Sequence, residues 1–268
     1  MLRLFSAAFA LLGSLIGPAL AQDVQRSECL AMANAPPRVR PVSFRQAAAA
    51  NDDVTITYAG HSTYYIDSPG GTRIATDYSG VYRTGRLPDV VTMNRAHSTH
   101  YTEHPDPRIK HVLHGWRDDG GAAEIDLTVG DMHVSNLPTN IRDWQGGTEM
   151  YGNSIFLFEM AGVCIAHLSH LHHLLTEQDL VLLGHIDVVM APVDGVYTMS
   201  QEDMAKVLEQ LHPRLVLPMH YFMRDVVDRF VDLVRDRYAV RFSESPTMQI
   251  SRATLPERPT IVVLPGGY

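Results

Sequence analysis

The residues in this sequence best suited to chemistry are its histidines. It has 14 histidines in 268 residues, and several follow short apolar runs typical of strands; these are His97, His100, His167, His170, His172, His173 and His220. Neutral imidazole is a common protein ligand for zinc, iron, copper and nickel. Side chains that project from rigid strand ends need little ordering before they bind. Histidines at three separate strand ends therefore predict a metal site where those ends meet.

Such a site would suit hydrolysis. Three imidazoles around a metal, with a fourth position open to water, lower the pKa of that water to about 7. An isolated histidine is more often an ordinary core or surface residue. We favour that ordinary role for five histidines outside the main groups, namely His61, His111, His133, His185 and His212. Spacing alone leaves both interpretations open for the rest.

The elements that must position these side chains change in character along the chain. Strand patterns are expected over residues 54–58, 63–66, 73–76, 90–93, 110–113, 125–129, 132–136, 154–159 and 163–167. Strands over 186–191, 215–219 and 260–264 then alternate with helices over 176–183, 200–211 and 224–238. Thr176 with Asp179, and Ser200 with Asp203, are typical of capped helix starts. A β-rich half followed by this alternation predicts two packed sheets with helices outside.

The chain start indicates export. Residues 1–21 combine an early Arg3, an apolar run and a small-residue cleavage pattern, as in a signal peptide cleaved after Ala21. The expected location is therefore periplasmic or secreted. Residues 22–50 form a leader rich in Ala, Pro and Arg, and residues 51–268 form one domain. No later segment is apolar and long enough to predict membrane insertion.

Composition limits the partners. The net charge is −8 and no Lys/Arg block occurs, which argues against nucleic acid or an anionic membrane surface as the main partner. The expected partner is a small-molecule substrate. Two cysteines are too few for a cysteine-based metal site. An oxidising compartment permits a bridge between Cys29 and Cys164, but the apolar run around Cys164 favours a buried free thiol.

Several segments resemble the metallo-β-lactamase superfamily, in its lactonase-like branch. They are residues 58–62 (Tyr-Ala-Gly-His-Ser), 73–77 ending in Asp, 184–195 with a Pro-Val-x-Gly turn, and 217–221 (Leu-Pro-Met-His-Tyr). The resemblance extends from about Val54 to His220. It implies an αββα sandwich of two mixed β-sheets with outer helices. It also implies that His220, which follows Pro-Met, is a metal ligand.

The metal motifs depart from the family pattern. Where the family has His-x-His-x-Asp-His, residues 95–100 read Arg-Ala-His-Ser-Thr-His. No histidine follows Pro138-Thr139, and the family's His-Leu-Gly-Asp becomes His-Leu-Ser-His at 167–170. The resemblance therefore implies one metal ion instead of two. Its implied ligands are His97, His100, His170 and His220, with His61, His167 and His173 in supporting positions.

The implied function is a metal-dependent hydrolase acting on a small ester, lactone, amide or phosphoester. One divalent ion is expected, Zn²⁺ in the first place, with Fe or Mn as alternatives. The group that orients the nucleophile stays open among Thr99, His97, Asp77 and Glu103. Arg95 would bind an anionic substrate group or form an ion pair. The alternatives are a metal- or ligand-binding protein that has lost catalysis, and redox chemistry at iron or copper.

Overall fold

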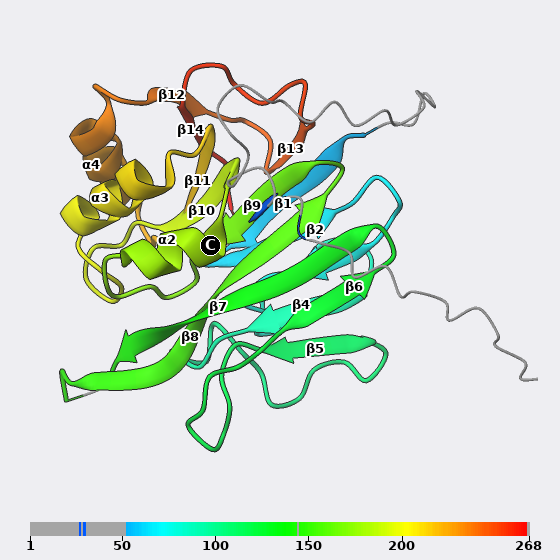
Figure 1. Ribbon diagram of the computed structural model, residues 1–268. Coiled ribbons are helices and arrows are strands. Elements are labelled where there is room, and N and C mark those ends of the chain that lie inside the picture. Colours follow the sequence, from blue (N-terminus) through cyan, green and yellow to red (C-terminus); the bar gives the residue numbers. More distant parts are fainter. Residues whose placement is uncertain (1–26, 28, 31–51, 144, 267–268) are drawn as a thin grey trace, which may run out of the picture.

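The protein is a sandwich of two mixed β-sheets in a computed structural model that describes residues 27, 29–30, 52–143 and 145–266 (Figure 1). The six-stranded sheet has the order β13-β1-β2-β3-β4-β5, with β1 Val54–Gly60, β2 Thr63–Asp67, β3 Arg73–Ala75, β4 Val90–Met93, β5 His111–His114 and β13 Thr247–Ile250. The eight-stranded sheet has the order β12-β14-β11-β10-β9-β8-β7-β6, with β6 Asp126–Val129, β7 Met132–Arg142, β8 Thr148–Met160, β9 Val163–His167, β10 Val188–Pro192, β11 Leu215–Met219, β12 Ala239–Phe242 and β14 Thr260–Val263. Each sheet contains both parallel and antiparallel pairs. The expected fold class is confirmed.

The main core lies between the sheets. Alternate residues of β1, Val54, Ile56 and Tyr58, are buried in it, while the residues between them are half-buried. The parallel strands β9, β10 and β11 are buried along their whole length, as is usual for strands covered on both faces. A second, smaller cluster contains Tyr65 and Met93, and the loop residues Tyr78 and Ile109 close it.

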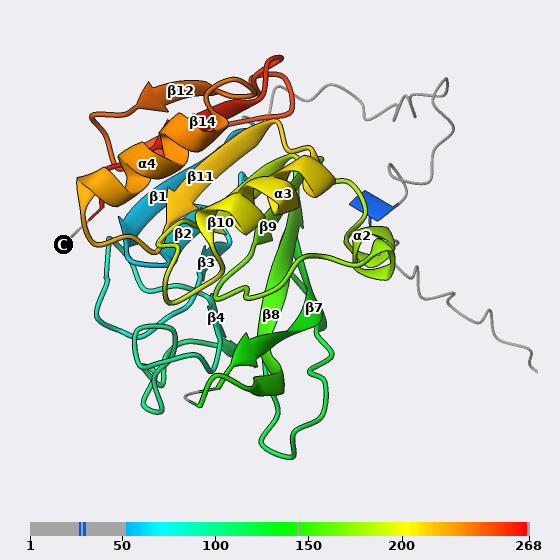
Figure 2. The same cartoon turned by 90° about the vertical axis from the view of Figure 1, so that its left-hand side faces the viewer.

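Three helices follow the strands of the second half: α2 Glu177–Leu183, α3 Gln201–Leu211 and α4 Arg224–Val234. Helices α3 and α4 lie over the outer side of the eight-stranded sheet (Figure 2). Thr176 and Asp179 form a full capping box on α2, and the Ser200 hydroxyl accepts from the Asp203 amide at the start of α3. Helix α4 ends at Val234, four residues before its expected end, and the chain then enters β12. Among the described residues, no helix is long and apolar enough to cross a bilayer.

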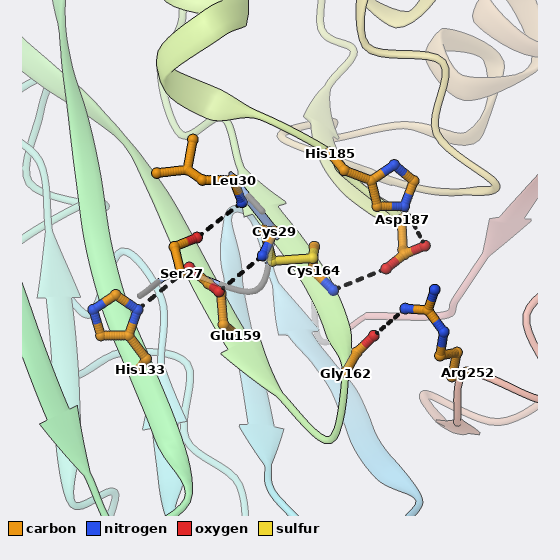
Figure 3. Close-up of a disulfide and its surroundings, with 10 residues drawn as sticks. All are labelled: Ser27, Cys29, Leu30, His133, Glu159, Gly162, Cys164, His185, Asp187 and Arg252. Carbon is orange, nitrogen blue, oxygen red and sulfur yellow. Dashed lines mark hydrogen bonds and ion pairs between the residues drawn. A yellow bond between two sulfur atoms is a disulfide. The ribbon is translucent and has the colours of Figure 1, made fainter. Parts of the chain in front are cut away.

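Cys29 and Cys164 are joined by a disulfide, so the expectation of a free thiol at Cys164 is wrong (Figure 3). The two Cα atoms lie 5.9 Å apart across 135 residues of sequence. The Cys29 amide donates to the Glu159 carboxylate on β8, which holds the segment beside β9. An apolar run correctly predicted burial of Cys164, but it carries no information about a distant partner. The expected signal peptide and most of the expected leader lie outside the described residues.

Candidate metal centre

The histidines collect at one edge of the sandwich. Strands β9, β10 and β11 run parallel, so their carboxyl ends share an edge of the eight-stranded sheet. His170 follows β9 and His220 follows β11. His97 and His100 lie in the loop after β4, on the facing sheet. The metal centre therefore takes its side chains from both layers.

The structure brings the four predicted ligands together. The ring centroid of His100 lies 4.4 Å from that of His97 and 5.1 Å from that of His220. The ring of His170 lies 5.0, 4.9 and 5.0 Å from the rings of His97, His100 and His220. The four rings are therefore close neighbours. Among the described residues, however, the nitrogens that all lie within 4.8 Å of one another belong to His97, His100, His220 and His61, and His170 is not in that set.

His61 joins this group, although the sequence indicated only an ordinary or supporting role. His61, His97, His100 and His220 each offer a nitrogen, and these atoms all lie within 4.8 Å of one another. The His220 amide donates to the His61 carbonyl at 2.7 Å, and the Tyr58 hydroxyl donates to the same oxygen at 2.7 Å. The turn between β1 and β2 is thereby held at the end of β11. Gly60-His61-Ser62, placed at a turn, was the signal available in the sequence.

Asp77 orients His100 from behind. Its Oδ2 accepts from His100 Nδ1 and from the Ser169 hydroxyl, each at 2.6 Å, and its Oδ1 accepts from Asn94 Nδ2 at 3.1 Å. Burial by itself raises the pKa of this carboxyl, but His100 and His167 lower it more, and the net pKa falls below the ordinary value. Asp77 is thus an ionised, fully bonded support, and Nδ1 of His100 must carry a proton.

Asp194 has the corresponding place beside His220. Its Oδ1 lies 3.1 Å from His220 Nδ1, and its Oδ2 accepts from the amides of Val196 and Thr198. Burial raises the pKa of Asp194, but its contacts with His220 and Thr198 outweigh burial and lower it overall. Asp194 was not predicted. A carboxylate directly after a buried parallel strand was the available signal.

The two Nε2 atoms then face each other. His100 Nε2 and His220 Nε2 are 3.2 Å apart. The hydrogen bond from His100 Nδ1 to Asp77 leaves a lone pair on His100 Nε2. His220 Nδ1 lies 3.1 Å from Asp194 but forms no hydrogen bond in the structure. A cation between the two Nε2 atoms would be stabilised by both rings. Two nitrogens bound at about 2.0–2.1 Å to a tetrahedral zinc would be about 3.3 Å apart, close to the observed spacing.

Two further observations fit a metal. His170 Nε2 is buried and has no hydrogen-bond partner in the structure. Burial, followed by the neighbouring imidazoles, lowers the pKa of His61 to about 2 and that of His97 to about 4. The same causes lower the pKa of His170. These rings are therefore neutral at physiological pH, which is the form that binds metal.

The backbone is strained at the same place. His61, Asp77, Ser169 and His220 have φ values of 50°, 40°, 51° and 57°. Positive φ is uncommon in residues other than glycine, and it persists where the surrounding structure enforces it. Each of these residues belongs to or contacts the metal centre, so the fold constrains this site closely.

The remaining candidates have distinct positions. The Thr99 hydroxyl lies 2.6 Å from His97 Nδ1 and 3.4 Å from His61 Nε2. Arg95 is exposed and pairs with Glu149 at 3.7 Å, which supports the ion-pair interpretation of this residue. Glu103 is exposed on the loop after His100.

The supporting histidines lie behind the site. His167 Nε2 is 2.9 Å from the Ser62 carbonyl, and His173 Nε2 accepts from the Asn140 amide at 3.3 Å. His133 and His185 pair with carboxylates elsewhere, and His212 ends α3, as expected for ordinary histidines. His111 lies half-buried on the edge strand β5.

Comparison with known proteins agrees with this geometry. A model of the beta-lactamase superfamily domain matches residues 55–220, from β1 to the histidine after β11. The chain belongs to the metallo-β-lactamase superfamily. A relative in this superfamily, a UPF0173 metal-dependent hydrolase from Pyrococcus furiosus, is 24% identical over 63% of this chain and 84% of its own length.

Solved structures show the same superfamily fold. A proposed Zn-dependent hydrolase of the metallo-β-lactamase superfamily from Thermotoga maritima is 24% identical with a TM-score of 0.57, covering 79% of this chain and 98% of its own. The metallo hydrolase Igni18 from Ignicoccus hospitalis is 19% identical with a TM-score of 0.53, covering 80% of this chain and 97% of its own. These likenesses support the two-sheet architecture.

Proposed function

We propose that this protein is an exported metal-dependent hydrolase that acts on a small ester, lactone, amide or phosphoester. The observation that carries the proposal is the pair of facing Nε2 atoms of His100 and His220, 3.2 Å apart. Buried carboxylates hold both rings in this orientation. Relatives named as metal-dependent hydrolases support the same activity.

A divalent metal bound here would polarise a carbonyl or phosphoryl oxygen and supply a nucleophilic hydroxide. His100 and His220 would hold it, with His97, His170 and His61 as the further nitrogen donors. Thr99 stands where the family has aspartate, and its hydroxyl, 2.6 Å from His97 Nδ1, is the group that we propose orients the attacking water. For an ester, one water is consumed, the acyl–oxygen bond breaks, and the products are an acid and an alcohol.

A single ion, in the first place Zn²⁺, is the proposed cofactor. Neutral imidazoles suit zinc, and iron or manganese are the alternatives. Arg95 occupies the family's first ligand position and points to Glu149. The loss of that ligand and the positive charge in its place both disfavour a second ion.

Export is supported by the disulfide. Disulfides persist in oxidising compartments and are rare in the cytosol. The bridge between Cys29 and Cys164 agrees with the signal sequence expected over residues 1–21. N-terminal sequencing of the protein from the periplasm or medium should begin at Gln22. Recovery of the uncleaved chain from the cytosol would contradict export.

A non-catalytic metal-binding role is the second candidate, and one observation favours it. Five imidazoles surround the site, enough to fill the coordination sphere and leave no place for water. Such a protein would bind metal tightly and hydrolyse no substrate.

Metal analysis combined with hydrolysis assays separates these roles. We expect about one zinc per purified chain, by mass spectrometry of the metal, and hydrolysis of at least one ester, lactone, amide or phosphoester that stops on chelation. Stoichiometric metal without turnover across the panel would favour the binding protein. Protein that binds none of Zn²⁺, Fe²⁺ or Mn²⁺ would refute both roles.

A further inference from the structure

We propose that aromatic rings beside the metal centre, two of them exposed and one half-buried, bind an uncharged apolar acyl group of the substrate. This inference rests on the proposed hydrolase function and narrows its substrate class. The aromatic rim, as we call it, consists of Tyr82, Tyr197 and Phe222. The ring of Phe222 lies 5.5 Å from that of His61 and 6.2 Å from that of His220.

The rim is continuous with the metal centre. Tyr82 stacks on His61 with ring centroids 6.2 Å apart, and Tyr197 meets Phe222 edge-on at 6.2 Å. These rings come from three loops, which follow β3, β10 and β11. A substrate that reaches the histidines from this side must pass over them.

The rim exposes an unusual amount of apolar surface. Tyr197 is 60% exposed and Phe222 55% exposed, and their chain neighbours Val196 and Met223 are 70% and 61% exposed. Exposed apolar residues that gather in one place mark binding sites more often than single ones do. Aromatic side chains contribute a large apolar contact area when they pack against an apolar group.

Most charged groups around the rim already have partners of opposite charge, which favours an uncharged group. Arg83, next to Tyr82, donates to the Gly80 carbonyl instead. Asp194 is held by backbone amides and by His220. Arg95 pairs with Glu149, and Arg224 pairs with Asp228. The rim itself contributes rings and two phenol hydroxyls, and no formal charge. An acyl chain or aromatic acyl group fits this surface better than a carboxylate does.

The test is a series of p-nitrophenyl esters hydrolysed by the zinc-containing protein: acetate, butyrate, hexanoate, octanoate and the negatively charged hemisuccinate. Full burial of one methylene raises affinity about fourfold, and an open rim covers the chain only partly. We expect kcat/KM to rise about tenfold from acetate to octanoate. The ratio of the octanoate to the acetate rate should fall close to one in Phe222→Ala and to an intermediate value in Phe222→Leu.

Val181→Ala is the matched control, because Val181 is 68% exposed on α2 and outside the rim. Its octanoate-to-acetate ratio should equal that of the wild type. An equal ratio in wild type and Phe222→Ala, or a preference for the hemisuccinate, would overturn the proposal. So would concentration-dependent dimerisation that disappears in Phe222→Ala, since a second copy would then occupy the rim.

A binding measurement keeps this inference separate from the hydrolase proposal. If no ester, lactone, amide or phosphoester is hydrolysed although zinc is bound, the proposed function fails. The rim is then tested by calorimetric titration of the zinc-containing protein with acetate and with octanoate. Tighter octanoate binding that is lost in Phe222→Ala would support the rim, and equal binding of both acids would refute it.

Discussion

Histidines near the two ends of strand β9 have opposite roles. At its start, Cys164 bridges to Cys29, and the nearby histidines, His133 and His185, are paired with carboxylates (Figure 3). Beyond its end, buried ring nitrogens of His170 and His172 lack hydrogen-bond partners in the structure. Unpaired buried polar atoms are costly and need an explanation. The start of β9, with its disulfide and ion pairs, therefore contributes to stability, and the histidines beyond its end offer nitrogens to a metal.

The pKa values of the histidines near the disulfide and at the metal centre also differ. Hydrogen bonding to Glu159, partly opposed by burial and assisted by Asp126, raises the pKa of His133 to about 9. Burial and neighbouring imidazoles lower the pKa of His61 to about 2. A histidine becomes a fixed cation when carboxylates surround it, and a neutral ligand when other histidines do. The predictions below test this contrast.

Removal of a ligand should have the largest effect. We expect His100→Ala and His220→Ala each to abolish stoichiometric metal binding, because these rings supply the facing Nε2 atoms. His111→Ala on β5 should retain the metal. Metal content is measured after gel filtration. Equal metal content in all three variants would refute the ligand assignment.

Removal of the disulfide should change the free energy of unfolding and leave the metal content unchanged. The Cys29→Ser/Cys164→Ser double variant is expected to lose about 2–5 kcal/mol of unfolding free energy, because a long loop is released in the unfolded chain. Denaturant unfolding measures this change. Its metal stoichiometry should equal that of the wild type. A variant with unchanged stability but reduced metal content would contradict the assignment of the disulfide to stability.

Asp77→Asn should weaken the metal site without deleting a ligand. The carboxylate accepts three hydrogen bonds and fixes the tautomer of His100. Loss of such support costs about 10–100-fold in metal affinity. Competition with a chromophoric chelator gives the affinity. Asp119→Asn, at an exposed aspartate paired with Arg117, is the control and should bind metal normally.

The smallest expected effect is a pH dependence of stability from His133. Its pKa rises from 6.5 in the unfolded chain to about 9 in the folded protein, so its contribution is full below pH 6.5 and is lost as pH rises through 9. After allowance for solvent screening, the loss is about 1–2 kcal/mol. His133→Gln should remove this slope between pH 6.5 and 9 in denaturant unfolding. An identical slope in the variant would show that Glu159 does not hold the proton.

Local patterns in the sequence predicted most of the fold. Alternating or continuous apolar runs located the strands of both sheets up to β11, and β14, because side-chain periodicity is a local property. Strands β12 and β13 were missed. They lie at the sheet edges, and two of the four residues in each are exposed, so they carry little apolar pattern. The last helix was expected to reach Tyr238, but α4 ends at Val234.

The sequence by itself determined that histidines follow strand ends and that the domain is a two-sheet sandwich. Only the tertiary structure decided which side chains meet: His61 and Asp194 at the metal centre, and Cys29 at Cys164. The physical reason is that strand patterns arise from contacts between near neighbours in the chain. A metal centre and a disulfide depend on distances of a few ångströms between segments far apart in sequence, which only the packing of the two sheets sets.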